Sequence, residues 1–170
     1  MEQTPYEIRP AAPSDMPDLV RIYNSNPSFL VHHLGSQQVD EDFLRREQRE
    51  MEAMGFLSCV VVERRTGERI GVLDYHTGET VYLSLLMLDG GWQGDGLGAV
   101  IYRQLEGEMA RRGAQAIRID VVDDYAGNVT PFWEKQGFTA QGRVQLDWGD
   151  KRSDAAMMVK ALRKGSTDDR

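Results

Sequence analysis

The chain has 170 residues, enough to bury one hydrophobic core, and its 41% hydrophobic residues exclude a disordered protein. Its formal net charge of −7 argues against nucleic acid as a partner, since a polyphosphate needs a continuous basic surface. With no run of about 18 apolar residues and no signal-peptide pattern, we expect no membrane helix and a cytoplasmic protein. We predict one domain over residues 1–163 and a disordered tail over 164–170, which has no apolar anchor.

The first part of the chain has the pattern of a strand followed by two helices. Residues 6–9 are predicted to form the strand, and apolar residues at helical spacing after Ser14 predict the first helix. The helical pattern lapses from Asn24 to Val39, which we interpret as an irregular stretch. Residues 40–42 are all acidic and open the second helix, since negative charge favours the positive end of a helix dipole.

After Gly55 the pattern changes to that of β-strands. Three strands joined by short turns predict an antiparallel meander over 56–63, 69–75 and 81–88. The rest of the chain predicts a helix, a strand, a short helix and a final hairpin, over residues 96–112, 116–122, 131–136, and 138–146 with 155–162.

The most informative segment is a strand that runs directly into a glycine-rich loop and then into a helix. Four apolar residues end at Leu88, and the loop that follows carries Gly94, Gly96 and Gly98. Glycine lets the backbone approach a ligand without an intervening Cβ, and the N–H groups of a first helical turn attract anions. The three glycines therefore predict a loop that binds a pyrophosphate, although alternate glycines also occur in simple tight turns.

Two other classes of glycine-loop protein fit this segment poorly. A P-loop nucleoside triphosphatase needs Lys followed by Ser or Thr after its glycines, whereas Leu97-Gly98-Ala99 stands here. A dinucleotide-binding fold places its loop after the first strand of a parallel sheet, whereas three antiparallel strands are predicted before this loop. The segment therefore favours a different phosphate-containing ligand.

From Gln93 to Gly98 the loop reads Gln-Gly-Asp-Gly-Leu-Gly. This resembles the acyl-CoA signature of the GNAT superfamily of N-acetyltransferases, which is Gln or Arg, two residues, Gly, one residue, then Gly or Ala. A second block, from Asn128 to Phe138, resembles the short helix beside the coenzyme in that family. The resemblance implies an α/β (α+β) fold with a mixed, mostly antiparallel central sheet. It also implies that this sheet is splayed between strands 4 and 5 and has helices on both faces.

The resemblance further implies that acetyl-CoA is a co-substrate. In this family, backbone groups of the splayed fourth strand bond the pantetheine amides in the manner of an added strand. By position, the implied cofactor-binding residues are Leu86, Leu88, Gln93, Gly94, Asp95, Gly96, Leu97, Gly98, Ala99, Asn128 and Phe132. For Phe132, ordinary core packing is an equally good interpretation.

Acetyl transfer to an amine needs a group that takes up the amine's proton and a donor that stabilises the tetrahedral oxyanion. The resemblance places the oxyanion donor at a backbone N–H near Leu86. Strand alternation predicts that Tyr82 and Ser84 lie on the same face as Leu86, so Tyr82 is a candidate catalytic residue at the acceptor site. Asp120 on the next strand is a second candidate, which could relay a proton through water, although a solvated aspartate is the commoner reading.

The acid that protonates the leaving thiolate cannot be transferred from the family. Many members carry a tyrosine four residues before the glycine that is Gly137 here, and this chain has Trp133 at that position. An indole N–H donates a hydrogen bond but is not a useful acid. Tyr125 is the candidate substitute, with Tyr102 as a further one.

The acceptor site is less marked in the sequence. Tyr23 and His32 are our candidate substrate-binding residues, because loops between the first two helices can cover a cleft, and Asp74 at the end of the third predicted strand is a weaker candidate. We expect no metal, since the adjacent histidines at 32 and 33 diverge in most backbones and no carboxylate or cysteine is spaced to complete a metal site.

Together these patterns predict an N-acetyltransferase that transfers an acetyl group from acetyl-CoA to a primary amine of a small molecule or peptide. Direct attack in a ternary complex is the expected mechanism. The alternative is a non-catalytic acyl-CoA-binding or regulatory domain, which Trp133 favours. The oligomeric state is left open, a homodimer included.

Overall fold

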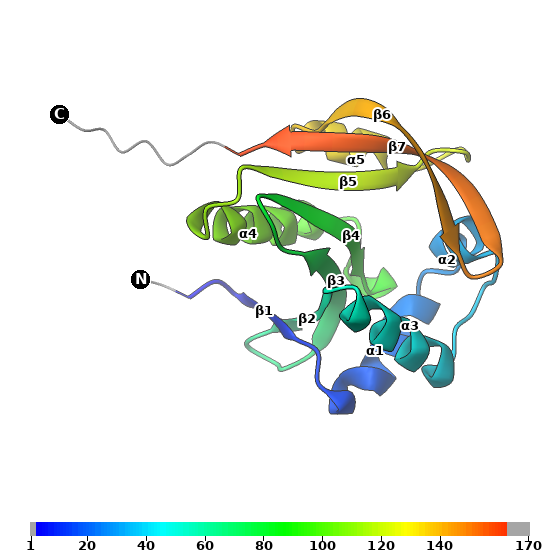
Figure 1. Ribbon diagram of the computed structural model, residues 1–170. Helices are drawn as coiled ribbons and strands as arrows, with labels where there is room; N and C mark the ends of the chain where they lie inside the picture. Colours follow the sequence, from blue (N-terminus) through cyan, green and yellow to red (C-terminus); the bar gives the residue numbers. More distant parts are fainter. Residues whose placement is uncertain (1–2, 163–170) are drawn as a thin grey trace.

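The computed structural model describes residues 3–162, which form one seven-stranded sheet with helices on both faces (Figure 1). The strands are β1 (Tyr6–Pro10), β2 (Leu57–Glu63), β3 (Arg69–His76), β4 (Thr80–Leu88), β5 (Ala116–Val122), β6 (Thr139–Trp148) and β7 (Lys151–Ala161). Their order across the sheet is β1-β2-β3-β4-β5-β7-β6, and neighbours are antiparallel except β4 and β5. The predicted mixed, mostly antiparallel sheet is confirmed. The predicted tail over 164–170 lies outside the described residues.

The helices divide the core into two parts. They are α1 (Met16–Asn24), α2 (Pro27–Leu34), α3 (Glu41–Ala53), α4 (Leu97–Arg111) and α5 (Thr130–Lys135), with short 3-10 turns η1 (Pro13–Asp15) and η2 (Gly90–Trp92). On one face, α1 and α3 bury residues such as Leu19 and Leu44, and on the other α4 and α5 bury Ile101 and Trp133. None of the helices in residues 3–162 combines the length and the apolarity that crossing a membrane requires.

The sheet divides between β4 and β5, which diverge in Figure 1. Their parallel pairing consists of three residue pairs and ends where Tyr82 lies opposite Arg118. Beyond that point, residues 83–88 keep β3 as their one strand partner among the described residues. The predicted splay is confirmed, and it leaves one edge of β4 without a neighbouring strand.

The prediction of an irregular stretch from Asn24 to Val39 is wrong, because this stretch contains α2. Pro27 begins the helix, where its missing N–H costs nothing, and Gly35 ends it in the left-handed region with φ 76°. Leu30 and Leu34 lie on one face and are buried. The helix has 8 residues and this short apolar face, so its periodicity is weak in the sequence.

The predicted alternation of β4 is also wrong, because the strand contains a β-bulge. The pairing with β3 skips Ser84, which lies between the paired residues Leu83 and Leu85. One extra residue reverses the faces beyond it, so Leu83 and Leu86 pack on the α4 side and Leu85 on the α1 side. Tyr82 and Leu86, predicted to share a face, therefore point to opposite faces.

A buried ion pair ties the start of α1 to the sheet. The Asp15 carboxylate is fully buried and accepts hydrogen bonds from Arg9 at 2.7 and 3.0 Å, from Arg69 at 3.1 Å and from the Ala12 N–H at 2.7 Å. The bonds from Arg9, against the opposing effect of burial, hold the pKa of Asp15 well below its usual range. β1, β3 and α1 therefore meet at one charged contact.

We predict that Asp15→Ala lowers the free energy of unfolding by about 3 kcal/mol at neutral pH, because it leaves two arginines without their buried partner. Asp18→Ala is the control, since the pairs of Asp18 with Arg21 at 3.2 Å and with Arg69 at 3.9 Å are both partly exposed and their loss should cost less than about 1 kcal/mol. Because the folded-state pKa of Asp15 is lowered, its contribution is complete above about pH 4 and disappears as the pH falls through that lowered value. Urea unfolding at several pH values measures both effects, and equal losses in the two variants would contradict this role of Asp15.

Candidate functional site

The amino-terminal end of α4 presents unpaired backbone donors. Gly96 precedes the helix with φ 76°, and the N–H groups of residues 97–99 have no acceptor within the helix. No side chain in residues 3–162 caps this end. Free N–H groups and the helix dipole together favour an anion here.

The glycines of this loop leave its outer side open. Gly94 and Gly96 have φ values of 99° and 76°, and a Cβ at either would have no described atom within 4 Å. Asp95 between them is exposed. Gly98 is different, because a Cβ there would lie 3.5 Å from the ring of Phe132 on α5. The predicted phosphate loop is thus open at Gly94 and Gly96 and bounded by Phe132 at Gly98. This open face fits a pyrophosphate.

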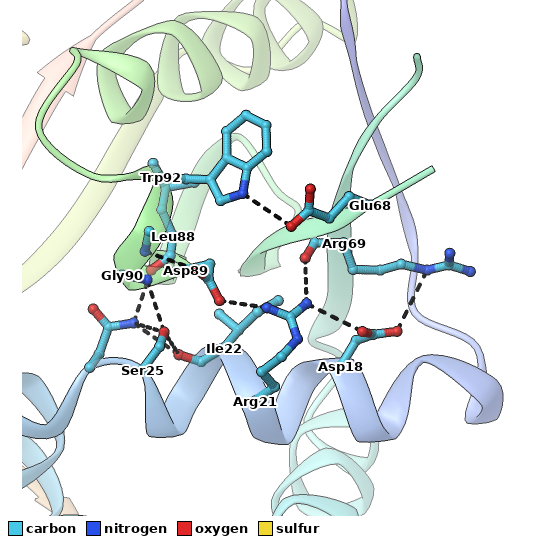
Figure 2. A network of polar contacts seen from close by, with 12 residues as sticks. Asp18, Arg21, Ile22, Ser25, Glu68, Arg69, Leu88, Asp89, Gly90 and Trp92 are labelled. Carbon is cyan, nitrogen blue, oxygen red and sulfur yellow. Dashed lines mark hydrogen bonds and ion pairs between the residues drawn. The ribbon is translucent and has the colours of Figure 1, made fainter. Parts of the chain in front are cut away.

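The end of α1 holds the beginning of this loop in place (Figure 2). Arg21 forms an ion pair of 2.5 Å with Asp89, and the Gly90 N–H donates to the Ser25 hydroxyl oxygen at 2.9 Å. A Cβ at Gly90 would lie 2.7 Å from the backbone oxygen of Ser25, so this approach requires glycine. The loop between β4 and α4 is therefore fixed from the opposite face of the sheet.

Asn26 is a residue of this site that the sequence analysis missed. Its amide donates to the carbonyl of Leu88 at 2.9 Å, and its oxygen accepts from the side chain of Gln93. Gln93 also donates to the Leu88 carbonyl at 2.9 Å. Asn26 lies 62 and 67 residues from these partners, so no local pattern could identify it. The first residue of the signature, Gln93, thus turns its side chain inward.

The free edge of β4 directs backbone groups into the gap between β4 and β5. The Asp89 N–H donates to Ile70 on β3 at 2.8 Å, so residue 89 faces β3. Backbone groups alternate along an antiparallel strand, and those of Leu88 and Leu86 therefore face the gap. The Leu88 carbonyl is engaged by Asn26 and Gln93, which leaves its N–H and both groups of Leu86 for a ligand.

Two of the three predicted catalytic residues, Tyr82 and Asp120, meet where the gap begins. The Tyr82 hydroxyl donates to Asp120 at 2.8 Å, and Arg118 donates to the same carboxylate at 3.0 and 3.1 Å. The Asp120 side chain is 3% exposed, so it is not the solvated aspartate of the commoner reading. Burial raises the pKa of Tyr82, and the charge of Asp120 raises it further. The Tyr82 hydroxyl therefore stays protonated.

Tyr125 and His32 are also brought together. Their rings stack at 3.9 Å, and on the next residue of α2 the ring of His33 stacks on Phe29 at 3.8 Å. Phe29 in turn meets the edge of Trp148 at the tip of the β6–β7 hairpin. Burial is the main reason that the pKa of Tyr125 is raised and that of His33 is lowered. This aromatic cluster joins α2 to the β5–α5 loop and to the hairpin.

The remaining candidates lie in other surroundings. Tyr23 on α1 and Asp74 on β3 are buried together between the sheet and the helices α1 and α3, and neither takes part in the His32 cluster. Asn128 uses its side chain locally, donating to the Tyr125 carbonyl at 2.9 Å and accepting from the Thr130 N–H at 3.0 Å.

The position where many GNAT enzymes have an acidic tyrosine is a core position here. Trp133 is buried and packs edge-on against Tyr102 and Phe138, with ring centres 5.4 Å apart in both pairs. The Tyr102 hydroxyl is fully buried and has no hydrogen-bond partner in residues 3–162. Both side chains are therefore part of the core on the α4 face of the sheet.

The fold is that of acetyltransferases of known structure. The N-acetyltransferase of Salmonella typhimurium that modifies the N-terminal serine of ribosomal protein L7/L12 superposes with a TM-score of 0.76 at 19% identity, over 95% of this chain and 97% of that one. An acetyltransferase of Thermus thermophilus gives 0.74 at 22% identity, over 95% and 100%. Spermidine N-acetyltransferase of Vibrio cholerae, solved with CoA and spermine, gives 0.71 at 13% identity, over 93% and 96%. No curated protein sequence matches the chain.

The family model described as "Acetyltransferase (GNAT) domain" matches residues 30–151. The chain therefore belongs to the GNAT family of N-acetyltransferases. The matched segment includes both the glycine loop and the Asn128 block on which the resemblance was based. Among residues 3–162, no group of three or more His, Cys, Asp or Glu side chains is arranged to hold a metal ion.

We predict that Asn26→Ala weakens acetyl-CoA binding about tenfold, because Gln93 and the Leu88 carbonyl lose the partner that fixes the loop. Isothermal titration with acetyl-CoA measures the dissociation constant, and thermal melting confirms that the variant is folded. Asn24→Ala is the matched control, since Asn24 makes two hydrogen bonds to the backbone of Val39 and none to the loop. Equal affinities in the two variants would show that Asn26 does not position the cofactor loop.

Proposed function

We propose that this protein transfers an acetyl group from acetyl-CoA to a primary amine by direct attack within a ternary complex. The observation that carries the proposal is the continuity of two unsatisfied backbone surfaces, the free edge of β4 and the uncapped start of α4. An extended amide chain that ends in a pyrophosphate can use both surfaces at once. Membership of the GNAT family is consistent with that use.

The chain's own residues would hold acetyl-CoA as follows. The N–H groups of residues 93–99 bind the pyrophosphate, and Phe132 packs beside the loop. Along the pantetheine arm, Leu86 and the N–H of Leu88 supply the strand-type hydrogen bonds, with Asn128 at the edge of the neighbouring loop. The bound coenzyme supplies a thioester, whose acetyl carbon is the electrophile.

Three groups are proposed to assist the transfer. A backbone N–H near Leu86 stabilises the oxyanion, a contribution of roughly 3 kcal/mol for one preorganised donor. Tyr82, fixed by Asp120, borders the acceptor at the point where the gap begins. Tyr125, held by its stack on His32, donates a proton to the leaving thiolate.

The acceptor is proposed to be an aliphatic primary amine of a small molecule or of a peptide amino terminus. The Salmonella relative modifies an N-terminal serine and the Vibrio relative is a spermidine acetyltransferase, and both acceptors are aliphatic amines. The formal charge of −7 attracts such cations. One sheet contains both β1 and β7, which supports the proposal that residues 1–163 are a single domain, and we propose that it acts in the cytoplasm.

We predict amine-dependent release of the coenzyme A thiol, followed with a thiol reagent, when acetyl-CoA is mixed with spermidine or a hexapeptide that begins with serine. Direct attack predicts intersecting double-reciprocal plots, whereas a covalent acetyl-enzyme predicts parallel ones. Tight acetyl-CoA binding without release for any amine would favour the non-catalytic acyl-CoA-binding domain instead.

We also predict that Gly98→Glu reduces acetyl-CoA affinity at least about 100-fold, because its carboxylate would lie in the first turn of α4, where the pyrophosphate is proposed to bind. The control is Gly107→Glu, the same substitution further along α4, where a Cβ would make ordinary contact with Arg111 at 3.5 Å. Titration calorimetry of both variants measures their affinity for acetyl-CoA, and wild-type affinity in Gly98→Glu would refute the placement of the pyrophosphate.

A further inference from the structure

Asp74 is a buried carboxyl group that has no role in the reaction as proposed above. Its side chain lies on β3 beneath α1 and α3, the residue is 3% exposed, and Oδ1 has no hydrogen-bond partner in residues 3–162. Asp74 lines a cavity of about 10 Å³ together with Tyr23, Glu47 and Ser58. A cavity of that size holds one water molecule, and unpaired polar groups are what such a water requires.

This cavity brings two carboxyl groups, those of Asp74 and Glu47, close to each other. Neither lysine nor arginine is among the described residues that line it. Burial raises the pKa of Asp74 to about 7, the Ser58 hydroxyl opposes that rise and the charge of Glu47 adds to it. A carboxyl group in these surroundings exchanges its proton near neutral pH, which is what a general base requires.

The position of Asp74 links the cavity to the reaction site. On the neighbouring strand, Asp74 lies opposite Leu85, one residue before Leu86. The bulged Ser84 donates from its hydroxyl to the Asp74 carbonyl at 3.2 Å. Asp74 is therefore one strand away from the free edge of β4, on the face that carries α1 and α3.

Glu47 connects the cavity to the β6–β7 hairpin. It lines the cavity with Asp74, is only half-buried, and accepts a hydrogen bond of 2.8 Å from Trp148 at the hairpin tip. Burial raises the pKa of Glu47 as well. Trp148 also contacts Phe29 on α2, the helix that carries the candidate substrate-binding residue His32.

Asp120, the carboxylate first predicted to relay a proton, is less suited to do so. Arg118 donates two hydrogen bonds to it and Tyr82 donates a third. Most of its lone pairs are thus engaged by a permanent cation and a hydroxyl, whereas Oδ1 of Asp74 is free to accept from a water.

We propose that Asp74 accepts the proton that the acceptor's ammonium group must lose, through Glu47 and one water molecule in the cavity. The inference rests on the proposed amine acetylation. The ammonium passes one proton along this path to the Asp74 carboxylate, and the nitrogen lone pair then bonds the acetyl carbon. The carbon–sulfur bond breaks, the sulfur leaves with its electron pair and takes a proton from Tyr125, and the second proton lost by nitrogen restores the Tyr125 hydroxyl. Asp74 returns its proton to solvent after turnover.

The first test is a titration of the protein alone, which needs no acceptor. The carbon-13 signal of the Asp74 carboxyl should titrate near pH 7 in the wild type and be absent in Asp74→Asn. The other titratable groups facing Asp74 are Tyr23 from α1 and Glu47 from α3, while β2 presents Ser58 and β4 presents leucine. Cys59 on β2 is affected by the charge of Asp74 but packs on the other face of the sheet. Burial raises the pKa of Tyr23 well above 10 and that of Cys59 to about 11, so neither titrates in this range.

The titration of Asp74 should also change the free energy of unfolding with pH. A carboxyl whose folded-state pKa is raised stabilises the fold when protonated and loses that contribution as the pH rises from about 4 to about 7. Asp74→Asn should therefore gain stability relative to the wild type over that interval. A carboxyl signal that titrates below about pH 5 would overturn the proposal.

The second test is kinetic and uses spermidine and the serine peptide as probes. Asp74→Asn should lower kcat about 100-fold at pH 7 with the dissociation constant of acetyl-CoA unchanged, and part of the rate should return at pH 9, where more of the amine is already neutral. Glu52→Gln, which removes an exposed carboxylate from the same helix as Glu47, is the control that should keep the wild-type rate. Wild-type kcat and pH profile in Asp74→Asn would overturn the proposal. Absence of thiol release with every amine would contradict the proposed function instead, and the titration would still decide the state of Asp74.

Discussion

The site depends on the early end of the pairing between β4 and β5. These parallel strands share three residue pairs, and beyond Tyr82 and Arg118 they separate. β5 pairs with β7 along its whole length, while the bulge at Ser84 bends β4 close to the point of separation. Since a strand edge without a neighbour has unsatisfied N–H and C=O groups, the separation creates a binding surface from the backbone itself. The uncapped start of α4 continues that surface with further N–H groups.

The end of α1 gives this surface a fixed shape and links it to the Asp74 cavity. Arg21, Ser25 and Asn26 each bond a different part of the segment from Leu88 to Gln93. The same helix places Tyr23 beside the Asp74 cavity on the other side of α1. A movement of α1 on acceptor binding would therefore reach the coenzyme loop directly, so the proposed sites for the two substrates share one structural support.

Local sequence patterns predicted most of the fold and the loop but not the contacts that join distant segments. Hydrophobic periodicity and turn residues gave β5 and the core of α4, and the glycines with Gln93 marked the phosphate loop. The faces of β4 were mispredicted because a bulge adds one residue without altering local composition. Asn26 was missed because its role depends on partners more than sixty residues away. Asp74 was selected as a substrate-binding residue, but that no lysine or arginine of residues 3–162 lines its cavity is visible only once α1 and α3 are packed over β3.

Amide hydrogen exchange with and without acetyl-CoA tests most directly whether the coenzyme occupies the edge of β4 and the start of α4. Binding there predicts slower exchange at Leu86, Leu88 and residues 94–99, whose N–H groups would gain acceptors. Exchange along β6, on the far edge of the sheet, should not change. Unchanged exchange at Leu86 and in the loop, with protection elsewhere, would contradict this account of the site.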